Sequence, residues 1–269
     1  FPQVYHTPYY LAPYRSGLPM LLTVYDLIPI HYPRTVSARA RLFFRLSTSL
    51  ALRAACVIIA ISSATRNDFL QAFQVPAHKI RAIPLAADQS FRPQPTDVVA
   101  RVRQKYALPE KFLLYIGINK PHKNLVRLVE AWGMCQPSGW QLLIGGAWDA
   151  RYPEARQVAS KLGSIHFIGN IPERDLPALY AAADWFIFPS LYEGFGLPVL
   201  EAMACGTPVM CGYISGLAEV AGEAAFSFDP RDARNMAGAI EIATRDTTIR
   251  ETHAARGLAQ AAKFSWDRT

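Results

Sequence analysis

The segment of residues 189–209 holds the densest group of residues that could bind a charged or hydroxyl-rich ligand, and it reads PSLYEGFGLPVLEAMACGTPV. Gly194 and Gly196 flank Phe195, so the backbone can approach a ligand with no Cβ atom in the way. Pro198 suits the first turn of a helix, and the free N–H groups of that turn would face the same ligand. The pattern therefore predicts a loop and a helix start that hold an anion or a row of sugar hydroxyls.

Two glutamates accompany this loop. Glu193 lies before the predicted helix and Glu201 within its first turns, so both can point toward one cleft. Leu200 and Met203 form the buried side of that helix, and an unpaired carboxylate beside such an apolar stripe costs free energy. A carboxylate that accepts two hydrogen bonds from vicinal hydroxyls, such as those of a ribose, would offset this cost. Glu201 is therefore a candidate ribose ligand.

A second candidate loop, residues 117–125, reads GINKPHKNL. It places Lys120, His122 and Lys123 just before a helix that we expect to begin near Asn124. Cations at a helix start oppose the helix dipole unless an anion lies between them, and a pyrophosphate would fit there. Lysines in an exposed turn are the alternative if this loop is taken alone. The Walker A pattern and a strand-end pair of aspartates are both missing, so we expect neither a nucleotide hydrolase nor a bound metal.

The elements that must position these loops follow from the apolar pattern. From residue 20 onward, short apolar runs alternate with longer segments of helical period, which is typical of a parallel sheet with crossover helices. The expected strands are residues 21–27, 57–62 and 80–84 in the first part and 112–117, 141–145, 165–169, 185–189, 208–211 and 225–228 in the second. Ligands of such sheets bind beyond the carboxyl ends of the strands, where both candidate loops lie.

The alternation breaks between residues 91 and 109, where three prolines and a charged stretch replace any strand-like run. We therefore expect a first domain at residues 1–91, a linker at 92–110 and a second Rossmann-like domain at 111–269. The first part has only three expected strands, and the chain starts with Phe1 instead of Met. We expect the first domain to be incomplete, as in a fragment.

The net charge of +7 is unevenly distributed. Residues 1–105 carry 13 Lys and Arg against 4 Asp and Glu, whereas residues 106–269 carry 15 against 17. Such asymmetry points to an anionic partner of the first part, which could be a phosphorylated substrate, an acidic lipid surface or nucleic acid. On a helical wheel, one side carries Arg34, Arg41 and Arg45 and the opposite side Phe43, Leu46, Leu50 and Ala54. A membrane-binding helix and an ordinary solvated helix both remain open.

Segments for membrane insertion or export are not evident in the sequence. The longest apolar stretch in the first half, residues 54–64, is shorter than the ~20 residues that cross a bilayer, and no cleavable signal stands at the start. The four cysteines lack the paired spacing of a zinc site or a disulfide framework. We therefore expect a cytoplasmic protein whose cysteines are small buried hydrophobes.

Taken together, these loops resemble those of the retaining glycosyltransferases of family four, which have the GT-B architecture of two Rossmann-like domains facing a cleft. The strongest match covers residues 165–230, and its motif EGFGLPVLEAMACG, with seven residues between two glutamates, is highly specific for that family. Weaker similarity extends through GINKPHKNL, IPLAADQSFRP and TVYDLIPIHYP, so that nearly the whole chain is covered. The implied fold class is α/β, of the GT-B type, with an incomplete N-terminal domain.

The resemblance implies roles for individual residues on the donor side. Glu193 would lie at the transferred sugar near the reacting centre, and Lys123 would neutralise the diphosphate leaving group. Glu201 would bind the ribose, and Ile171 would lie along the nucleobase. The remaining donor contacts would come from a set of backbone and basic groups, namely Gly117, Lys120, His122, Gly194, Phe195, Gly196 and Leu197.

One departure from the family pattern concerns the charge that faces the diphosphate. Members often carry an arginine soon after the glycine of the second loop, whereas Gly117 is followed here by Ile118 and Asn119. Lys120 or His122 is then the candidate second cation, unless one cation suffices.

A second departure lies in the first domain. A histidine usually precedes the aspartate of its loop and contacts the donor sugar, whereas Tyr25 precedes Asp26 here. Tyr25 and Asp26 are the candidate sugar contacts of this domain. The departure favours an alternative, a non-catalytic module that binds a nucleotide sugar or an anionic polymer. A dinucleotide-dependent oxidoreductase is disfavoured, because Val199 replaces the third glycine of its fingerprint and no acidic residue ends the next expected strand.

The function implied by the resemblance is transfer of a hexose from a nucleotide-diphosphate sugar to an acceptor hydroxyl, with retention and without a metal. PHKNL followed by EGFGLP resembles the mannosyl and related hexosyl branches of the family, so we expect mannose as the sugar and GDP-mannose as the donor. The expected acceptor is a glycan or lipid-linked glycan, which a peripheral protein would meet through its basic first part at the inner face of a membrane. No further cofactor and no nucleic acid partner are expected.

Overall fold

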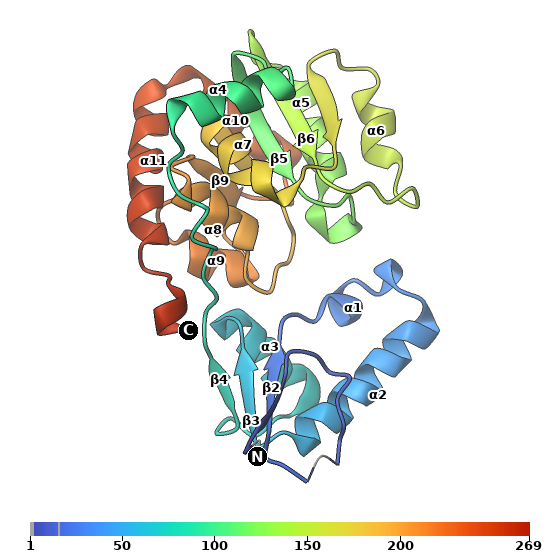
Figure 1. The fold of residues 1–269 in the computed structure, drawn as a ribbon. Coiled ribbons are helices and arrows are strands. Elements are labelled where there is room, and N and C mark those ends of the chain that lie inside the picture. Colours follow the sequence, from blue (N-terminus) through green and yellow to red (C-terminus); the bar gives the residue numbers. More distant parts are fainter. Residues whose placement is uncertain (1–2, 16) are drawn as a thin grey trace.

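The computed structural model describes residues 3–15 and 17–269, and the chain forms two parallel sheets flanked by helices (Figure 1). The first sheet contains β1 (Tyr5–Thr7), β2 (Met20–Val24), β3 (Val57–Ala60) and β4 (Ile80–Ala82), in that order. The second contains β5 (Lys111–Ile116), β6 (Trp140–Gly145), β7 (Ile165–Gly169), β8 (Trp185–Phe188), β9 (Val209–Gly212) and β10 (Phe226–Phe228). Its strand order is β10-β9-β8-β5-β6-β7. The predicted α/β fold with two Rossmann-like parallel sheets is confirmed.

Helices connect the strands as crossovers. Those of the first domain are α1 (Ile28–His31), α2 (Ala38–Ala54) and α3 (Ser63–Phe73). The later ones are α4 (Thr96–Lys105), α5 (Leu125–Cys135), α6 (Glu154–Ala159), α7 (Leu176–Ala182), α8 (Leu197–Ala204), α9 (Ser215–Ala221), α10 (Ala233–Arg245) and α11 (Thr247–Ala261). Short 3-10 turns lie at Pro33–Thr35, Pro121–Lys123, Glu173–Asp175 and Trp266–Arg268. Serine caps fix two starts, since Ser37 and Ser62 accept backbone N–H bonds at the beginnings of α2 and α3.

The sequence predicted every strand from β2 to β10 to within three residues at each end, and it missed β1. The predicted strands run too far at their carboxyl ends, where residues 25–27 and 61–62 leave the sheet to form loops of the cleft. β1 is too short to show a pattern and is held by pairing with β2, beginning with the Tyr5 N–H to Pro19 carbonyl bond. The described part of the first domain therefore has four strands instead of the expected three.

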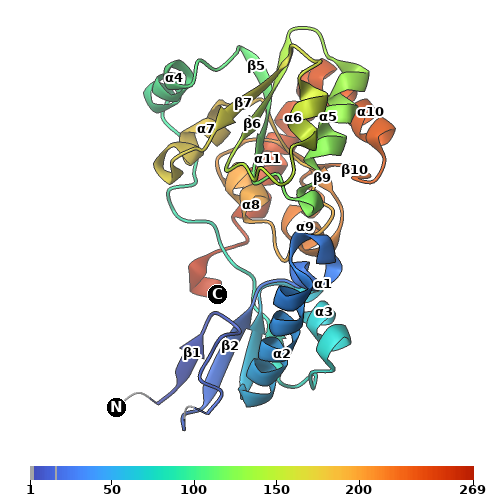
Figure 2. The same ribbon diagram turned by 90° about the vertical axis from the view of Figure 1, so that its right-hand side faces the viewer.

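The second sheet is the main core of the molecule. The four residues of β8 are fully buried, as are residues 112–115 of β5. In Figure 2, α5, α6 and α10 cover one face of this sheet, and α4, α7 and α8 cover the other. Burial on both faces explains why these strands appear in the sequence as unbroken apolar runs.

The segment predicted as a linker contains α4, which packs against α7 in the second domain. Val102 is buried there, and the Arg103 guanidinium donates a hydrogen bond to the Ala182 carbonyl at 3.2 Å. The C-terminal turn returns to the connection between the domains, where the Thr269 hydroxyl donates to the Pro84 carbonyl (Figure 1). The open connection between the two sheets is thus confined to residues near 83–95.

All four cysteines are free thiols. Cys205 and Cys211 are buried, as expected, but Cys56 is exposed because it lies on the turn between α2 and β3. The prediction that all four are buried is wrong for Cys56. No helix within the described residues combines the length and apolar character needed to cross a membrane.

Candidate active site

The loop between β8 and α8 carries Glu193 and starts the helix as predicted. Gly196 caps α8 with φ of 116°, a conformation that favours glycine, and a Cβ atom there would clash with Leu217. Pro198 lies in the first turn of α8, where its missing N–H leaves no hydrogen bond unmade. The N–H groups of Val199 and Leu200 donate to the Gly196 carbonyl at 3.0 and 3.2 Å, so this turn leaves the Leu197 N–H for a ligand.

Glu193 and Lys123 meet directly, although they come from loops 70 residues apart. Lys123 Nζ donates to Glu193 Oε1 at 2.7 Å, and the two side chains are only 15% and 11% exposed. The ammonium also lies 5.0 Å from the centre of the Phe188 ring. A pair this buried is strongly destabilised when one partner is removed, so a ligand that draws Lys123 away must offer another anion.

The backbone of Glu193 is fixed by α9. Its N–H donates to the Ser215 hydroxyl at 3.0 Å, and its carbonyl accepts from the Gly216 N–H at 3.1 Å. Ser215 has φ of 42°, which is uncommon for a residue with a side chain, and a Cβ atom on Gly216 would clash with the Gly194 carbonyl. Sequence reasoning missed both residues. The only signal was an SG pair following the end of a predicted strand.

The lysine loop contains two lysines and, between them, one buried histidine ring. His122 is 2% exposed, and burial, together with the charges of Lys123 and Lys120, lowers its pKa to about 3. His122 is therefore not the second cation that the sequence suggested. Lys120 is half-buried, and its charge lowers the pKa of Asp26, which places it near the cleft. Lys120 remains the candidate for the second positive charge.

Two asparagine side chains, also missed by sequence reasoning, hold the lysine loop in place. The Asn119 amide donates to the Asp149 and Tyr152 carbonyls at 2.9 and 2.6 Å, and its oxygen accepts from the Asp149 N–H. The Asn124 amide donates to the Pro189 and Pro230 carbonyls at 3.1 and 2.6 Å. Asn119 therefore holds the lysine loop in place through its side-chain amide.

Glu201 lies apart from the Lys123 pair, on the inner side of α8. Its Oε2 accepts a hydrogen bond from the Tyr180 hydroxyl at 3.1 Å, and no salt-bridge cation is found for it among the described residues. Burial raises the pKa of Glu201 to about 7, and the charge of Glu173 adds to this increase. The structure thus has the unpaired, half-buried carboxylate that the sequence pattern predicted.

The structure buries the side chains of two predicted donor contacts. Phe195 packs edge-on against Phe264 at 5.9 Å between ring centres, so only its backbone is available to a ligand. Ile171 is also buried and lies against Gly145, which leaves little of it for a nucleobase. Leu197 opens α8 and Gly117 follows β5, both half-buried at the cleft edge.

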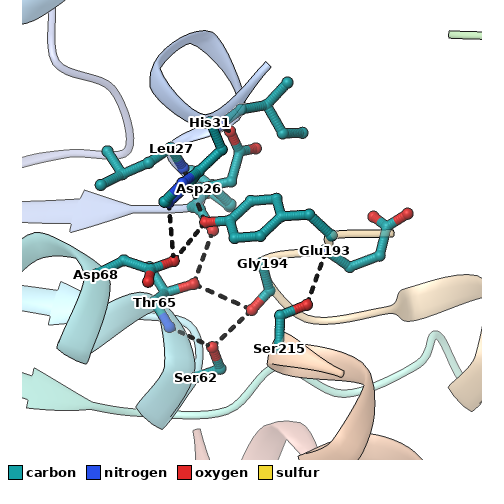
Figure 3. A network of polar contacts seen from close by, with 12 residues as sticks. Asp26, Leu27, His31, Ser62, Thr65, Asp68, Glu193, Gly194 and Ser215 are labelled. Carbon is teal, nitrogen blue, oxygen red and sulfur yellow. Dashed lines mark hydrogen bonds and ion pairs between the residues drawn. The ribbon is translucent and has the colours of Figure 1, made fainter. Parts of the chain in front are cut away.

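Asp26 and Tyr25 complete the site from the first domain. Asp26 Oδ1 accepts from the Ile28 N–H at 2.9 Å, and burial raises its pKa, with a further increase from the charge of Glu193. Asp26 and Glu193 thus lie on opposite sides of the domain boundary (Figure 3), close enough for the charge of Glu193 to affect the pKa of Asp26. The Tyr25 side chain is exposed, but its carbonyl abuts Gly194, where a Cβ atom would clash with the carbonyl oxygen. Gly194 thus lacks a side chain so that the two domains can touch, whereas the sequence suggested that it lets a ligand approach the backbone.

Among the described residues, no group of three or more His, Cys, Asp and Glu side chains is arranged to hold a metal ion. The site brings together Lys123, Glu193, Lys120 and Asp26 at the boundary between the two sheets. Lys123, Glu193 and Lys120 belong to the second domain and Asp26 to the first, so the full set needs the domains in contact.

Comparison with known proteins identifies the family. The family described as glycosyl transferases group 1 matches residues 99–260, and the one described as Glycosyltransferase Family 4 matches residues 2–91. The chain is 35% identical to O-antigen chain mannosyltransferase B of Escherichia coli, over 98% of this chain and 71% of that protein. It is 30% identical to the serotype-specific mannosyltransferase WbdA of Escherichia coli, over 79% of this chain and 27% of that protein.

Solved structures share the fold of nearly all of this chain. Sucrose-phosphate synthase of Thermosynechococcus elongatus superposes with a TM-score of 0.81 at 28% identity, over 98% of this chain and 70% of its own. Anabaena Alr3699/HepE in complex with UDP and glucose gives 0.79 at 25% identity, over 92% of this chain and 68% of its own. The chain therefore belongs to the glycosyl transferases group 1 family and is a glycosyltransferase of the GT-B type.

Proposed function

We propose that the enzyme transfers a mannosyl group from GDP-mannose to a hydroxyl of a growing glycan, with retention of configuration and without a metal. The observation that carries the proposal is the buried Lys123–Glu193 pair at the start of α8. It supplies a desolvated cation and a carboxylate at one point of the cleft. Support for mannose comes from the relatives named above, whose names are those of mannosyltransferases.

The chemistry follows from where charge develops. As the bond between the anomeric carbon and the diphosphate breaks, its electron pair moves onto the phosphate oxygen. Lys123, Lys120 and the Leu197 N–H at the start of α8 stabilise this charge more than they stabilise the bound substrate. Each such donor typically lowers the barrier by ~3 kcal/mol, and burial increases its effect.

The remaining step needs no separate base. The acceptor oxygen bonds to the anomeric carbon on the face that the diphosphate leaves, and the acceptor proton passes to the departing phosphate oxygen. The diphosphate replaces Glu193 as the partner of Lys123, which frees the Glu193 carboxylate to accept hydrogen bonds from the transferred sugar. Asp26 lies across the boundary and would contact the sugars from the acceptor side.

We further propose that α2 contacts an anionic membrane surface. Leu42, Phe43, Leu46 and Leu50 are between 47% and 60% exposed, and α2 contains no acidic residue. Arg39, Arg45 and Arg53 are also exposed on this helix, while Phe44, Ala51 and Leu52 are its buried side. Arg34 lies in the preceding 3-10 turn, outside α2. An ordinary solvated helix would not carry such an apolar patch beside arginines, and this combination favours a lipid surface.

The catalytic assignment is tested by mannosyl transfer from GDP-mannose to a mannose-terminated oligosaccharide. Lys123→Ala should lower kcat about 100-fold, because it removes a donor to the leaving group. Lys105→Ala is the matched control, since Lys105 forms an ion pair with Asp175 away from the cleft and should keep the full rate. Proton NMR of the first product formed should show the anomeric configuration of the donor.

A buried charge left alone by Lys123→Ala could unfold the site. The double variant Lys123→Ala/Glu193→Gln removes both charges, and circular dichroism should show it folded while transfer stays at the level of the single variant. Unchanged kcat in both Lys123→Ala and Glu193→Ala would refute the assignment of these roles. A rate abolished by EDTA and restored by a divalent metal would refute the metal-free reaction.

A further inference from the structure

The loop that carries Glu193 is tied to the first domain by hydrogen bonds. The Gly194 carbonyl accepts from the Ser62 hydroxyl at 2.6 Å, and the Thr65 hydroxyl lies 3.0 Å from the same oxygen (Figure 3). The Thr65 hydroxyl also lies 3.1 Å from the Tyr25 carbonyl, so it contacts a carbonyl of each domain. Ser62 and Thr65 lie at the start of α3. The first backbone N–H groups of this helix, those of Ser63 and Ala64, donate to the carboxylate of Glu219 on α9.

Tyr192 makes two more side-chain hydrogen bonds across this boundary. Its hydroxyl accepts from the Leu27 N–H at 3.2 Å and donates to Asp68 Oδ2 at 2.6 Å, and both partners belong to the first domain. The His31 ring lies 4.7 Å from the Tyr192 ring, with Nε2 3.6 Å from the same Asp68 oxygen. Burial and the neighbouring Asp68 raise the pKa of Tyr192, so its hydroxyl remains a donor throughout the neutral range.

The positions of these partners in the sequence give the contact its meaning. Tyr192 directly precedes Glu193, and Leu27 directly follows Asp26. A single hydroxyl therefore joins the residues next to Asp26 and Glu193, the two carboxylates that lie on opposite sides of the domain boundary. We infer that Tyr192 is a positioning residue, whose hydrogen bonds to Leu27 and Asp68 hold Glu193 and Asp26 in register when the domains are closed. This inference rests on the proposed function, because it assigns Glu193 and Asp26 to one reacting sugar.

Such a role predicts that removing the Tyr192 hydroxyl lowers the transfer rate without weakening the binding of the nucleotide. The residues proposed to bind the nucleotide, among them Lys123 and Glu201, lie in the second domain. In the part of the chain that the structure describes, no hydrogen bond joins the Tyr192 side chain to either of them. A displacement of about 1 Å in a reacting group can reduce the rate about 100-fold. Losing the hydroxyl should therefore reduce kcat and spare nucleotide binding.

The test compares Tyr192→Phe with the unmodified enzyme in the same transfer assay and in calorimetric titrations with GDP. We expect kcat to fall about 10- to 100-fold and the Kd for GDP to stay within about threefold. Tyr106→Phe is the matched control, because the Tyr106 hydroxyl donates to Asp175 at the same 2.6 Å but lies within the second domain. It should keep the kcat of the unmodified enzyme.

A second pair of variants separates positioning from folding. Asp68→Asn keeps an oxygen that accepts from the Tyr192 hydroxyl and should retain more activity than Asp68→Ala, with similar melting temperatures. The inference is overturned if Tyr192→Phe keeps kcat within twofold, or if its GDP affinity falls by the same factor as its kcat. If the unmodified enzyme binds GDP but transfers no sugar, the proposed function fails. The role of Tyr192 is then tested by comparing crystal structures of the unmodified enzyme and Tyr192→Phe. If the Glu193 loop has the same position in both, the inference is overturned.

Discussion

Glu193 and Glu201 differ in what surrounds their carboxylates. Glu193 pairs with Lys123, whereas Glu201 accepts one hydrogen bond from Tyr180, and burial raises its pKa to about 7 from the ordinary 4.5. Because the folded-state pKa is the higher one, the folded protein binds this proton more tightly than the unfolded chain does. The stabilisation from protonated Glu201 is therefore complete below pH 4.5 and is lost as the pH rises to 7.

Glu201→Gln should consequently stabilise the ligand-free enzyme at pH 8 and change it little at pH 5, since glutamine is neutral at both. We expect a gain on the order of 1 kcal/mol at pH 8, reduced from the full pKa effect because Glu201 is partly solvated. Thermal unfolding at both pH values measures it. Glu130→Gln changes an exposed glutamate on α5 and should have no effect at either pH.

The same residue should make donor binding depend on pH. Ribose hydroxyls donate more strongly to a carboxylate than to an amide, so GDP affinity at pH 8 should fall about tenfold in Glu201→Gln. In the unmodified enzyme the affinity should drop between pH 8 and pH 6 as Glu201 becomes protonated. Both proteins share the titration of the GDP phosphate, so the ratio of their affinities isolates Glu201. A ratio that stays constant from pH 6 to pH 8 would contradict the ribose role.

At the scale of elements, α2 is the helix whose exposed surface differs most from an ordinary crossover helix. A crossover helix normally buries its apolar side on the sheet, and α2 does so with Phe44, Ala51 and Leu52. A second apolar patch around Phe43 and Leu46 faces away from the domain. The sequence placed these residues opposite the arginines, but it could not tell which apolar side meets the sheet.

The double variant Phe43→Ser/Leu46→Ser should bind vesicles of phosphatidylglycerol more weakly, by about tenfold, because two large apolar side chains no longer enter the interface. Flotation or calorimetry with 100-nm vesicles measures the affinity. Leu258→Ser is the control, since Leu258 is an exposed leucine on α11. Binding should also weaken with salt and be small for phosphatidylcholine. Equal binding of the double variant and the unmodified protein would exclude α2 as the lipid contact.

At the scale of the whole molecule, the contact between the domains depends on Gly194 and Gly216, where the neighbouring backbone leaves no room for a Cβ atom. The Tyr25 carbonyl occupies the space where a Cβ atom of Gly194 would lie, and the Gly194 carbonyl fills the corresponding space at Gly216. The two backbones are therefore as close as glycine permits. Since backbone atoms cannot be pushed aside as flexible side chains can, any larger residue must move the domains apart.

Gly194→Ala should open the cleft and reduce transfer at least tenfold while the second domain stays folded. Small-angle scattering should show a larger radius of gyration, because the first domain can no longer seat against the loop of Glu193. Gly163→Ala is the matched control, since an added Cβ there meets no atom within 4 Å. A variant at position 194 with an unchanged radius and an unchanged rate would show that this contact does not control closure.

Much of this molecule is determined by local sequence. Unbroken apolar runs predicted the buried strands of the second sheet. EGFGLP predicted the loop and the start of α8, because glycine permits a positive φ in the turn and proline fixes φ in the first helical turn. The half-buried state of Glu201 followed from its place beside the apolar side of one helix. These features depend on residues nearby in the sequence, so the sequence pattern predicts them.

The tertiary structure alone decided the rest. The neutral state of His122, the Glu193 contact with Ser215, the Tyr192 bonds to Leu27 and Asp68, and the outward patch of α2 all depend on segments far apart in sequence. Burial and hydrogen-bond partners are properties of the space around a side chain. Where that space is enclosed by another domain or a remote loop, residue type and spacing cannot specify it, and only the assembled fold does.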